Sequence, residues 1–427
     1  RGARALQNLT RVPAAIGMAG SADTRRPVFA GLDRKNLVLV ALCSLAFFLD
    51  CLIPALMGPL APVIAQSLHL SRTELGAVFS ANLVGQCIGL VTIPLAAVRL
   101  GHRNIIIWSM LGFAVAQLLT TFVPDRDMLV ASRLIAGIFL GGALPSCIAA
   151  VTQATPVARR GIAIMLLLTA FGLGGAAAGF LASLFLDGEE WRLAFSITGC
   201  ACLLAVLACW RWLEEPPVDE LPAHSRTGAR RRLIDIVSPP LLGGTLLLWL
   251  MFIGALTIYY CLSSWLPTLL IDIGRSPQLA AYAVGSYTTG GVISGLLIGP
   301  LIDRFGAHRL LSLFFAIAAI LLFAIGQGID ALSDATLLAL LATCGFFMLG
   351  AYGGINVVLA GYYPAALRAF GVGCAKSAGR LGTVLPPIAI GYGLSQGMKA
   401  ETIVSLFAVP AVLVTLALLL IRRQQRA

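Results

Sequence analysis

Residues 36–57 read NLVLVALCSLAFFLDCLIPALM and carry one charged side chain, Asp50. A helix rises 1.5 Å per residue, so this stretch is about 33 Å long as a helix. That length matches the roughly 30 Å hydrocarbon layer of a bilayer. The stretch therefore predicts a membrane-spanning helix with a carboxyl group near its middle.

Eleven further apolar stretches follow. Charged residues make up 11% of the chain and hydrophobic residues 59%, and the mean hydropathy is +0.92. A soluble protein of this length needs more polar surface than that. We predict an all-α membrane protein with twelve transmembrane helices in two six-helix bundles. After 36–57 the predicted spans are 74–97, 104–123, 128–150, 161–186, 191–213, 243–271, 280–302, 309–328, 333–360, 370–395 and 401–422.

The net charge of +11 is unevenly distributed between the connecting loops. The loops on the side of both termini carry Arg99, Arg103, Arg159, Arg160, Arg226, Arg230, Arg231, Arg232, Arg304, Arg309, Arg368, Arg422, Arg423 and Arg426, whereas the opposite loops carry mainly Arg72, Arg126, Arg275 and Lys399. Cytoplasmic loops of membrane proteins are rich in Lys and Arg. This rule predicts cytoplasmic termini and explains the basic charge better than nucleic-acid binding does.

The chain divides into two halves with a shared pattern. We expect cytoplasmic tails at 1–35 and 423–427, bundles at 36–213 and 241–422, and a charged cytoplasmic linker at 214–240. The first half contains Gly89-Leu90, Pro94-Leu95 and Gly101-His102-Arg103, and the second contains Gly295-Leu296, Pro300-Leu301 and Gly306-Ala307-His308-Arg309. Such a repeat predicts two helical bundles around a central cavity.

Two motifs resemble a known family. Residues 299–306, GPLIDRFG, look like the inner-loop signature of the major facilitator superfamily, and residues 133–145, RLIAGIFLGGALP, resemble its fourth-helix motif. Further stretches are similar to its aromatic acid:proton symporter branch: 259–270 (YYCLSSWLPTLL), 362–373 (YYPAALRAFGVG) and 379–382 (GRLG). The resemblance implies a secondary transporter that works by alternating access.

The sequence departs from the branch at three acids. The branch usually has Asp-x-x-Asp in its first helix, but Ile53 follows Asp50 at that spacing. The first-half loop lacks an acid between Pro94 and Gly101, and Gln153 stands where the branch often has Glu. These losses make a divergent substrate or a different coupling ion more plausible than in a typical member.

Asp50 and Arg133 are the candidates for proton coupling. An isolated carboxyl group inside a span must become protonated or find a cation. Arg133 lies about one turn into its span and must face the cavity or a partner. It could attract the substrate anion or act as a switchable partner of Asp50. The alternatives are a permanently paired structural Asp50 and an Arg133 that reaches back to the interface.

Lys376 and Arg380 are the strongest indication of an anionic substrate. They lie four residues apart and so share one helix face. Two cations on one membrane helix repel each other unless an anion joins them. The alternative is that one of them pairs with a lipid phosphate.

Aromatic and amide side chains complete the candidate site. Tyr259, Tyr260, Tyr287, Tyr352 and Asn356 are expected to line the cavity and bind a carboxylate on an apolar body, or alternatively to serve in packing. Asn82 and Gln86 are spaced i,i+4 and could equally join helices. A separate gating role, steadying the cytoplasmic gate, is expected for Asp303, Arg304 and Arg309.

These features predict proton-coupled uptake of a small organic anion, most plausibly an aromatic carboxylate, across a bacterial inner membrane. The alternative is an efflux antiporter for amphipathic compounds. The glycine-rich stretch Gly172–Gly179 lacks the proline that is usual in exporters, which favours uptake. A receptor without transport is a third interpretation, opposed by the retained Asp50, Arg133 and Arg380. We expect a monomer in the lipid bilayer, with no enzymatic activity, cofactor, metal or nucleic-acid partner.

Overall fold

The computed structural model describes residues 34–156, 159–215 and 235–424. Helices occupy most of this part of the chain, and it contains no strand. The first half comprises α2 (Arg34–Ser67), α3 (Arg72–Leu100), α4 (His102–Thr121), α5 (Arg126–Ala154), α6 (Arg160–Ala182) and α7 (Glu190–Trp212). The second comprises α9 (Pro239–Asp272), α10 (Pro277–Phe305), α11 (Ala307–Gly328), α12 (Asp334–Tyr362), α13 (Ala365–Gly382), α14 (Leu385–Ser395), α15 (Ala400–Leu406) and α16 (Ala408–Gln424).

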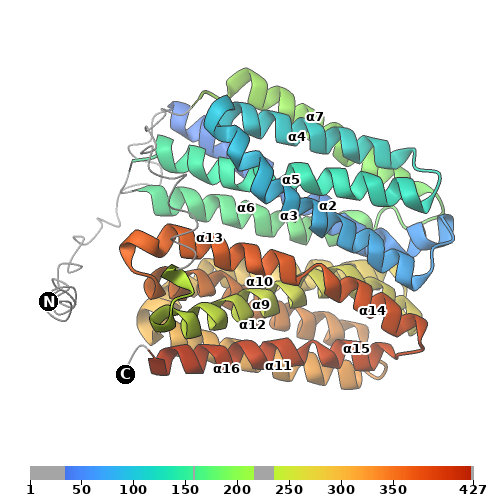
Figure 1. The fold of residues 1–427 in the computed structure, drawn as a ribbon. Helices are drawn as coiled ribbons and strands as arrows, with labels where there is room; N and C mark the ends of the chain where they lie inside the picture. The colour runs from blue at the N-terminus through green and yellow to red at the C-terminus, as the bar shows by residue number, and fades with distance from the viewer. Residues whose placement is uncertain (1–33, 157–158, 216–234, 425–427) are drawn as a thin grey trace, which may run out of the picture.

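The helices form two bundles that lie side by side, with the α2–α7 bundle against the α9–α16 bundle (Figure 1). Ten helices or helix pairs in the described ranges are long and apolar enough to cross a membrane. Helix α10 and the α13–α14 pair complete the twelve predicted segments. The twelve-helix fold is therefore confirmed. Residues 1–33 of the predicted N-terminal tail and residues 216–234 of the predicted linker lie outside the described residues.

Two predicted spans are broken, and one is longer than expected. Span 370–395 divides into α13 and α14 just before Pro386 and Pro387, which cannot donate backbone hydrogen bonds. Span 401–422 divides at Phe407, three residues before Pro410. The first span continues to Ser67 as one helix. Proline can be accommodated within a membrane helix because neighbouring groups satisfy the freed carbonyls.

The internal repeat is visible in the backbone. Gly101 joins α3 to α4 with φ +80°, and Gly306 joins α10 to α11 with φ +81°. Both values lie in the left-handed region, which glycine enters without steric cost. The two equivalent turns thus require glycine for the same reason, which supports the repeat seen in the sequence.

The molecule has two ends. We call the end that carries Arg34, Gln424 and both repeat turns the terminal face, and the end that carries Ser67, Arg72 and Asp272 the distal face. Near the distal face the bundles touch at several points: Arg72 pairs with Asp272, Ser80 donates to the Val384 carbonyl at 2.7 Å, and Gly58 lies against the backbone of Ser263. These contacts close the interface between the halves on the distal side.

Candidate functional site

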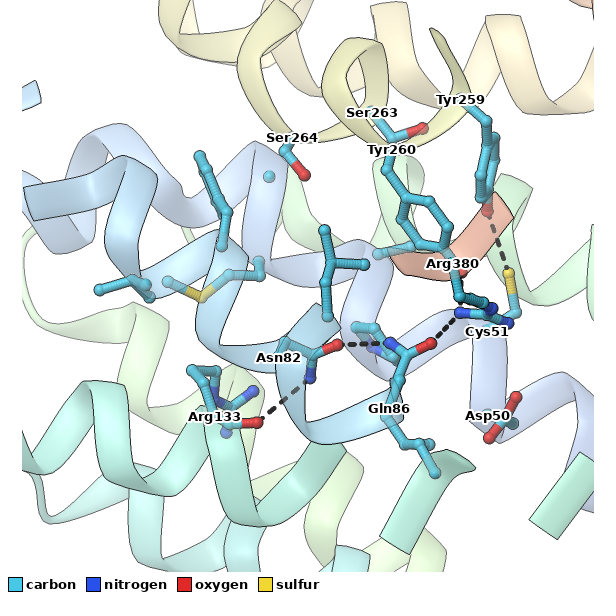
Figure 2. Close-up of a pocket in the computed structure, with 18 of the residues that line it drawn as sticks. Asp50, Cys51, Asn82, Gln86, Arg133, Tyr259, Tyr260, Ser263, Ser264 and Arg380 are labelled. Carbon is cyan, nitrogen blue, oxygen red and sulfur yellow. Dashed lines mark hydrogen bonds between the residues drawn. The ribbon is translucent and has the colours of Figure 1, made fainter. Parts of the chain in front are cut away.

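A cavity lies between the two bundles, between the distal contacts and the middle of the molecule (Figure 2). It encloses about 760 Å³ of empty space, including its opening. Both halves supply its walls. The polar or charged residues that line it are Asp50, Cys51, Asn82, Gln86, Arg133, Tyr259, Tyr260, Ser263, Ser264 and Arg380, and its aromatic apolar residues are Phe79 and Phe171. Both predicted proton-coupling residues, Asp50 and Arg133, and three further predicted substrate residues therefore border one cavity.

Arg380 of α13 crosses from the second half to the first. Its Nη1 donates to Oε1 of Gln86 on α3 and, at 2.5 Å, to the hydroxyl of Tyr260 on α9. The guanidinium carbon also lies 5.4 Å from the centre of the Tyr260 ring. A charge-assisted bond to each half thus holds the guanidinium at the cavity wall (Figure 2).

Asp50 of α2 lies near Arg380 and away from Arg133 in the close-up view (Figure 2). Its Oδ1 is buried and has no hydrogen-bond partner in the described part of the chain. Neither a hydrogen bond nor an ion pair joins this carboxyl group to Arg380. A buried carboxyl without a partner is costly, and such groups concentrate at functional sites.

Tyr259 and Tyr260 face the first half from α9. The Tyr259 hydroxyl lies 3.5 Å from Sγ of Cys51, which directly follows Asp50. The two tyrosine rings meet edge to face with centroids 5.0 Å apart. The pair therefore gives the cavity an aromatic wall with hydroxyl groups, as a carboxylate on an aromatic body would require.

The glycines of α5 set the position of the amides on α3. A Cβ at Gly137 would collide with the Asn82 carbonyl, and one at Gly141 would collide with the Gln86 carbonyl. Helices α3 and α5 therefore approach closely, as small residues at a membrane helix interface allow. The approach lets Nδ2 of Asn82 donate to the Arg133 carbonyl at 3.4 Å, while Nε2 of Gln86, one turn further along α3, donates to Oδ1 of Asn82 at 2.5 Å.

The Arg133 side chain points into the first bundle. It is 1% exposed, so it does not reach back to the interface. Its Nη2 donates to Gln117, at 3.1 Å, and to Thr120, both on α4, and its guanidinium carbon lies 5.1 Å from the Phe195 ring centre. These partners are neutral, and Nε has none among the described residues. Arg133 borders the cavity, but its hydrogen bonds run away from it.

The remaining predicted substrate residues are more dispersed. Lys376 is exposed on α13, one turn from Arg380 toward the terminal face. Tyr287 is fully buried and lies against Gly345, while the Tyr352 ring packs on Phe252 with centroids 6.2 Å apart. Asn356 donates to the Gly353 carbonyl of its own helix at 3.0 Å. None of these four predicted residues is among those that line the cavity.

The predicted gating residues occupy the terminal face. Asp303, Arg304 and Arg309 are exposed at the α10–α11 turn, and the Arg304 guanidinium lies over the Phe305 ring. No ion pair involves Asp303 within the described ranges. Ion pairing between the halves is instead seen at the distal face, between Arg72 and Asp272.

Every arginine in the distal loops is paired with an acid. Arg126 lies 3.2 Å from Glu74, Arg192 lies 2.5 Å from Glu189, and Arg275 lies 2.8 Å from Asp334. The Ser67 hydroxyl donates to Glu189 at 2.5 Å, and this bond, followed by Arg192, lowers the pKa of the Glu189 carboxyl. The distal arginines are therefore locally neutralised.

Most of the polar residues that line the cavity were predicted from the sequence, but several were not assigned a role. Cys51, Ser263 and Ser264 line the cavity beside predicted residues, and nothing in their residue type marked them. Asn82 and Gln86 were marked by their i,i+4 spacing, yet their role stayed open between packing and function. Only the approach of α13 to α3 shows that Gln86 contacts the cation of the opposite half.

Comparison with known proteins fits this architecture. The family model of the Major Facilitator Superfamily matches residues 43–284 and 248–427. The chain belongs to the major facilitator superfamily. Its 4-hydroxybenzoate transporter relative from Pseudomonas putida, PcaK, is 28% identical, with 91% of this chain and 93% of the relative covered. A gallate transporter from Pseudomonas putida is 29% identical, with 92% and 96% covered.

The predicted resemblance to the aromatic acid branch of this superfamily is thereby confirmed. A solved D-xylose-proton symporter matches the fold with a TM-score of 0.75 at 16% identity, covering 90% of this chain and 97% of the other. At that identity the likeness concerns the fold alone. This is a family of transporters, as predicted, and not of enzymes.

Proposed function

We propose that this protein takes up an aromatic carboxylate together with protons across the bacterial inner membrane, by alternating access. The observation that carries the proposal is Arg380, held at the wall of a central cavity beside Tyr260 and near the unpartnered Asp50. Relatives named for 4-hydroxybenzoate and gallate support this class of cargo.

Anion recognition is assigned to Arg380 and, on the terminal side, Lys376. The cavity walls then supply what a small aromatic acid needs: one cation for the carboxylate and rings for the body. The exposed Lys376 lies where an anion from the terminal side would pass before it reaches Arg380. Tyr352, Tyr287 and Asn356 are proposed to act only if the second bundle rearranges, because they do not line the cavity in this state.

The coupling of substrate to proton is assigned to two carboxyl groups, that of Asp50 and that of the substrate, which share the cation of Arg380. A cation as near as Arg380 favours the ionised form of Asp50 (Figure 2). A substrate carboxylate beside Arg380 would leave a net negative charge in a low-dielectric site, and that charge disfavours an ionised Asp50. Anion binding and protonation of Asp50 thereby promote each other, so the substrate and the proton cross the membrane together.

Arg133 is proposed as a partner for Asp50 in another state of the cycle. In the present state its guanidinium is held by neutral groups of α4, and no carboxylate neutralises it. A buried cation of this kind is available to a carboxyl group that approaches when the helices shift. Substrate binding by Arg133 has less support, because its hydrogen bonds run away from the cavity.

The orientation proposed places the terminal face in the cytoplasm. Among the described residues, Arg304, Arg309 and Arg368 of the terminal face form no ion pair, whereas each distal arginine has an acidic partner. This asymmetry agrees with the positive-inside rule. The gating residues Asp303, Arg304 and Arg309 would then close the cytoplasmic side once the distal contacts have opened. We propose a monomer.

Uptake into proteoliposomes tests the function. An inward proton gradient is expected to drive accumulation of labelled 4-hydroxybenzoate well above its external concentration. Unlabelled gallate should compete, and the neutral analogue 4-hydroxybenzamide should not. Accumulation that ignores the proton gradient would refute coupling, and equal competition by the amide would refute anion recognition.

A further inference from the structure

Both hydrogen bonds of the Arg380 guanidinium come from one nitrogen. Nη1 donates to Gln86 and to Tyr260, so Nε and Nη2 have no hydrogen-bond partner in the described residues. Those two nitrogens form one edge of the planar guanidinium. A carboxylate binds such an edge through two parallel hydrogen bonds, provided that the plane is held at a fixed angle.

We propose that Gln86 is a positioning residue for anion recognition: it fixes the Arg380 guanidinium so that its Nε–Nη2 edge is presented to the substrate carboxylate. The proposal rests on the function proposed above. Gln86 needs no contact with the substrate, because it acts through Arg380. Tyr260 holds the same nitrogen from the second half, so the two together define the plane.

The surroundings of Gln86 suit a rigid support. Its side chain is 7% exposed, and its Nε2 donates to Asn82 at 2.5 Å, which leaves Oε1 aimed at Arg380. The amide orientation is thus determined by two partners of opposite hydrogen-bonding character. The α3 backbone beneath it is fixed by its contact with Gly137 and Gly141 of α5.

The hydrogen bond from Arg380 to Gln86 joins the two halves of the molecule. Gln86 belongs to α3 and Arg380 to α13, so a motion that separates these helices breaks the bond. Arg380 then keeps only Tyr260 of its own half, and its guanidinium can turn. The anion site is therefore complete only while α3 and α13 are adjacent, which links the affinity for the carboxylate to the conformational state.

A double-mutant cycle tests whether Gln86 acts through Arg380. Binding of 4-hydroxybenzoate and 4-hydroxybenzamide to the full-length protein in nanodiscs is measured by calorimetry for wild type, Gln86→Leu, Arg380→Ala and the double variant. Gln86→Leu is expected to weaken binding of the acid by about tenfold and to leave the amide within twofold. In the Arg380→Ala background it should change acid binding by less than twofold, since coupled residues are not additive.

The control is Gln327→Leu, which removes another interhelical amide, one that bonds Ser405 within the second half at 3.1 Å. It should leave the affinities for acid and amide unchanged. An equal loss in both Arg380 backgrounds would show that Gln86 contacts the substrate itself, and no loss or tighter acid binding in Gln86→Leu would also overturn the proposal. A wild type that binds acid and amide equally would instead refute the proposed function.

If wild type binds acid and amide equally, a measurement without any ligand still tests the role of Gln86. Spin labels introduced as unnatural amino acids at the exposed Leu100 and Arg304 report the distance between the halves at the terminal face. Unnatural amino acids are preferable because the chain has ten cysteines. Gln86→Leu should broaden the distance distribution of the unliganded protein, and Gln327→Leu should not. An unchanged distribution in Gln86→Leu would show that it does not tie the halves together.

Discussion

Arg133 is buried and Arg380 is half-buried, and the two arginines, one in each bundle, have different surroundings. Arg133 donates only to neutral groups on α4, and Phe195 covers its guanidinium. Arg380 donates to one residue of each half, has an open edge and lies near an unpartnered carboxyl group. The first side chain joins helices of one bundle, whereas the second spans the interface between two bundles.

The contrast between Arg133 and Arg380 shows that a charged side chain within a membrane helix is not by itself a binding site. Both arginines satisfy the general expectation that membrane charges are functional. What separates them is the direction of the guanidinium and whether donors remain free for a ligand. A substrate can use the free donors of Arg380 at the cavity, while those of Arg133 are enclosed by protein.

The largest effect is expected at the carboxyl group that we associate with Arg380. Asp50→Asn should abolish gradient-driven accumulation, because an amide does not titrate and so cannot take up and release the coupled proton. Exchange of labelled for unlabelled substrate should persist, since the amide resembles the protonated carboxyl. Proteoliposome assays of net uptake and of exchange make the measurement. Full accumulation in this variant would separate Asp50 from coupling and weaken the contrast between the two arginines.

Truncation of each arginine compares the two sites directly. Arg380→Ala should weaken binding of 4-hydroxybenzoate by tenfold or more, since charge-assisted hydrogen bonds contribute about 1.5–3 kcal/mol each. Arg133→Met should keep the preference for acid over amide within about twofold of wild type, because its donors do not face the cavity. Calorimetry with both ligands gives the preference.

Uptake by the same Arg133→Met variant sharpens the comparison. Slow net uptake with intact binding would support Arg133 as a partner of Asp50 in another state. A loss of acid preference as large as that of Arg380→Ala would instead place both arginines at the anion site, and the distinction drawn here would be wrong.

A smaller effect is expected when one hydroxyl partner of each arginine is removed. Tyr260→Phe deletes the bond to Arg380 and should weaken acid binding by about threefold to tenfold, as expected for one hydrogen bond to a charged group. Thr120→Val deletes a bond to Arg133 and should alter thermal stability without changing acid binding. Parallel calorimetry and melting curves test both. Equal losses of acid affinity in the two variants would contradict the assignment.

The smallest effect is expected at an arginine whose acidic partner is exposed. Arg192 pairs with Glu189, whose side chain is 60% exposed. The pKa of Glu189 is lowered from its ordinary value of 4.5 by the Ser67 hydroxyl and by Arg192, so its stabilising contribution is present above that value and is lost as the pH falls through the lowered pKa. Glu189→Gln should lower the melting temperature by about 1 °C or less at pH 7.

Acidification should remove the difference in melting temperature between Glu189→Gln and wild type, because the protonated carboxyl no longer attracts Arg192. Melting curves recorded from pH 7 down to below pH 4 measure the convergence. A gap that widens on acidification would show that the sign of the linkage is wrong. A large difference in melting temperature at neutral pH would mean that an arginine with an exposed partner contributes as much to stability as the buried Arg133.

Much of the fold could be predicted because hydrophobicity and length determine which segments cross a membrane. The twelve segments, the repeat and the glycine turns at Gly101 and Gly306 follow from local composition. The breaks near Pro386 and Pro410 were harder to predict, since other prolines, such as Pro59 in α2, lie within a continuous helix. Whether a proline breaks a membrane helix depends on its neighbours.

The class of protein, the number of crossings and the charged residues that need an explanation follow from the sequence, because hydrocarbon favours apolar side chains and penalises ions whatever the fold. The arrangement of those charges depends on how the helices pack. Arg380 meets Gln86, which lies 294 residues away, and Arg133 turns toward Gln117 on the neighbouring helix. The direction of a side chain on a helix depends on which helix packs against it, and in this chain that packing brings together residues from both halves.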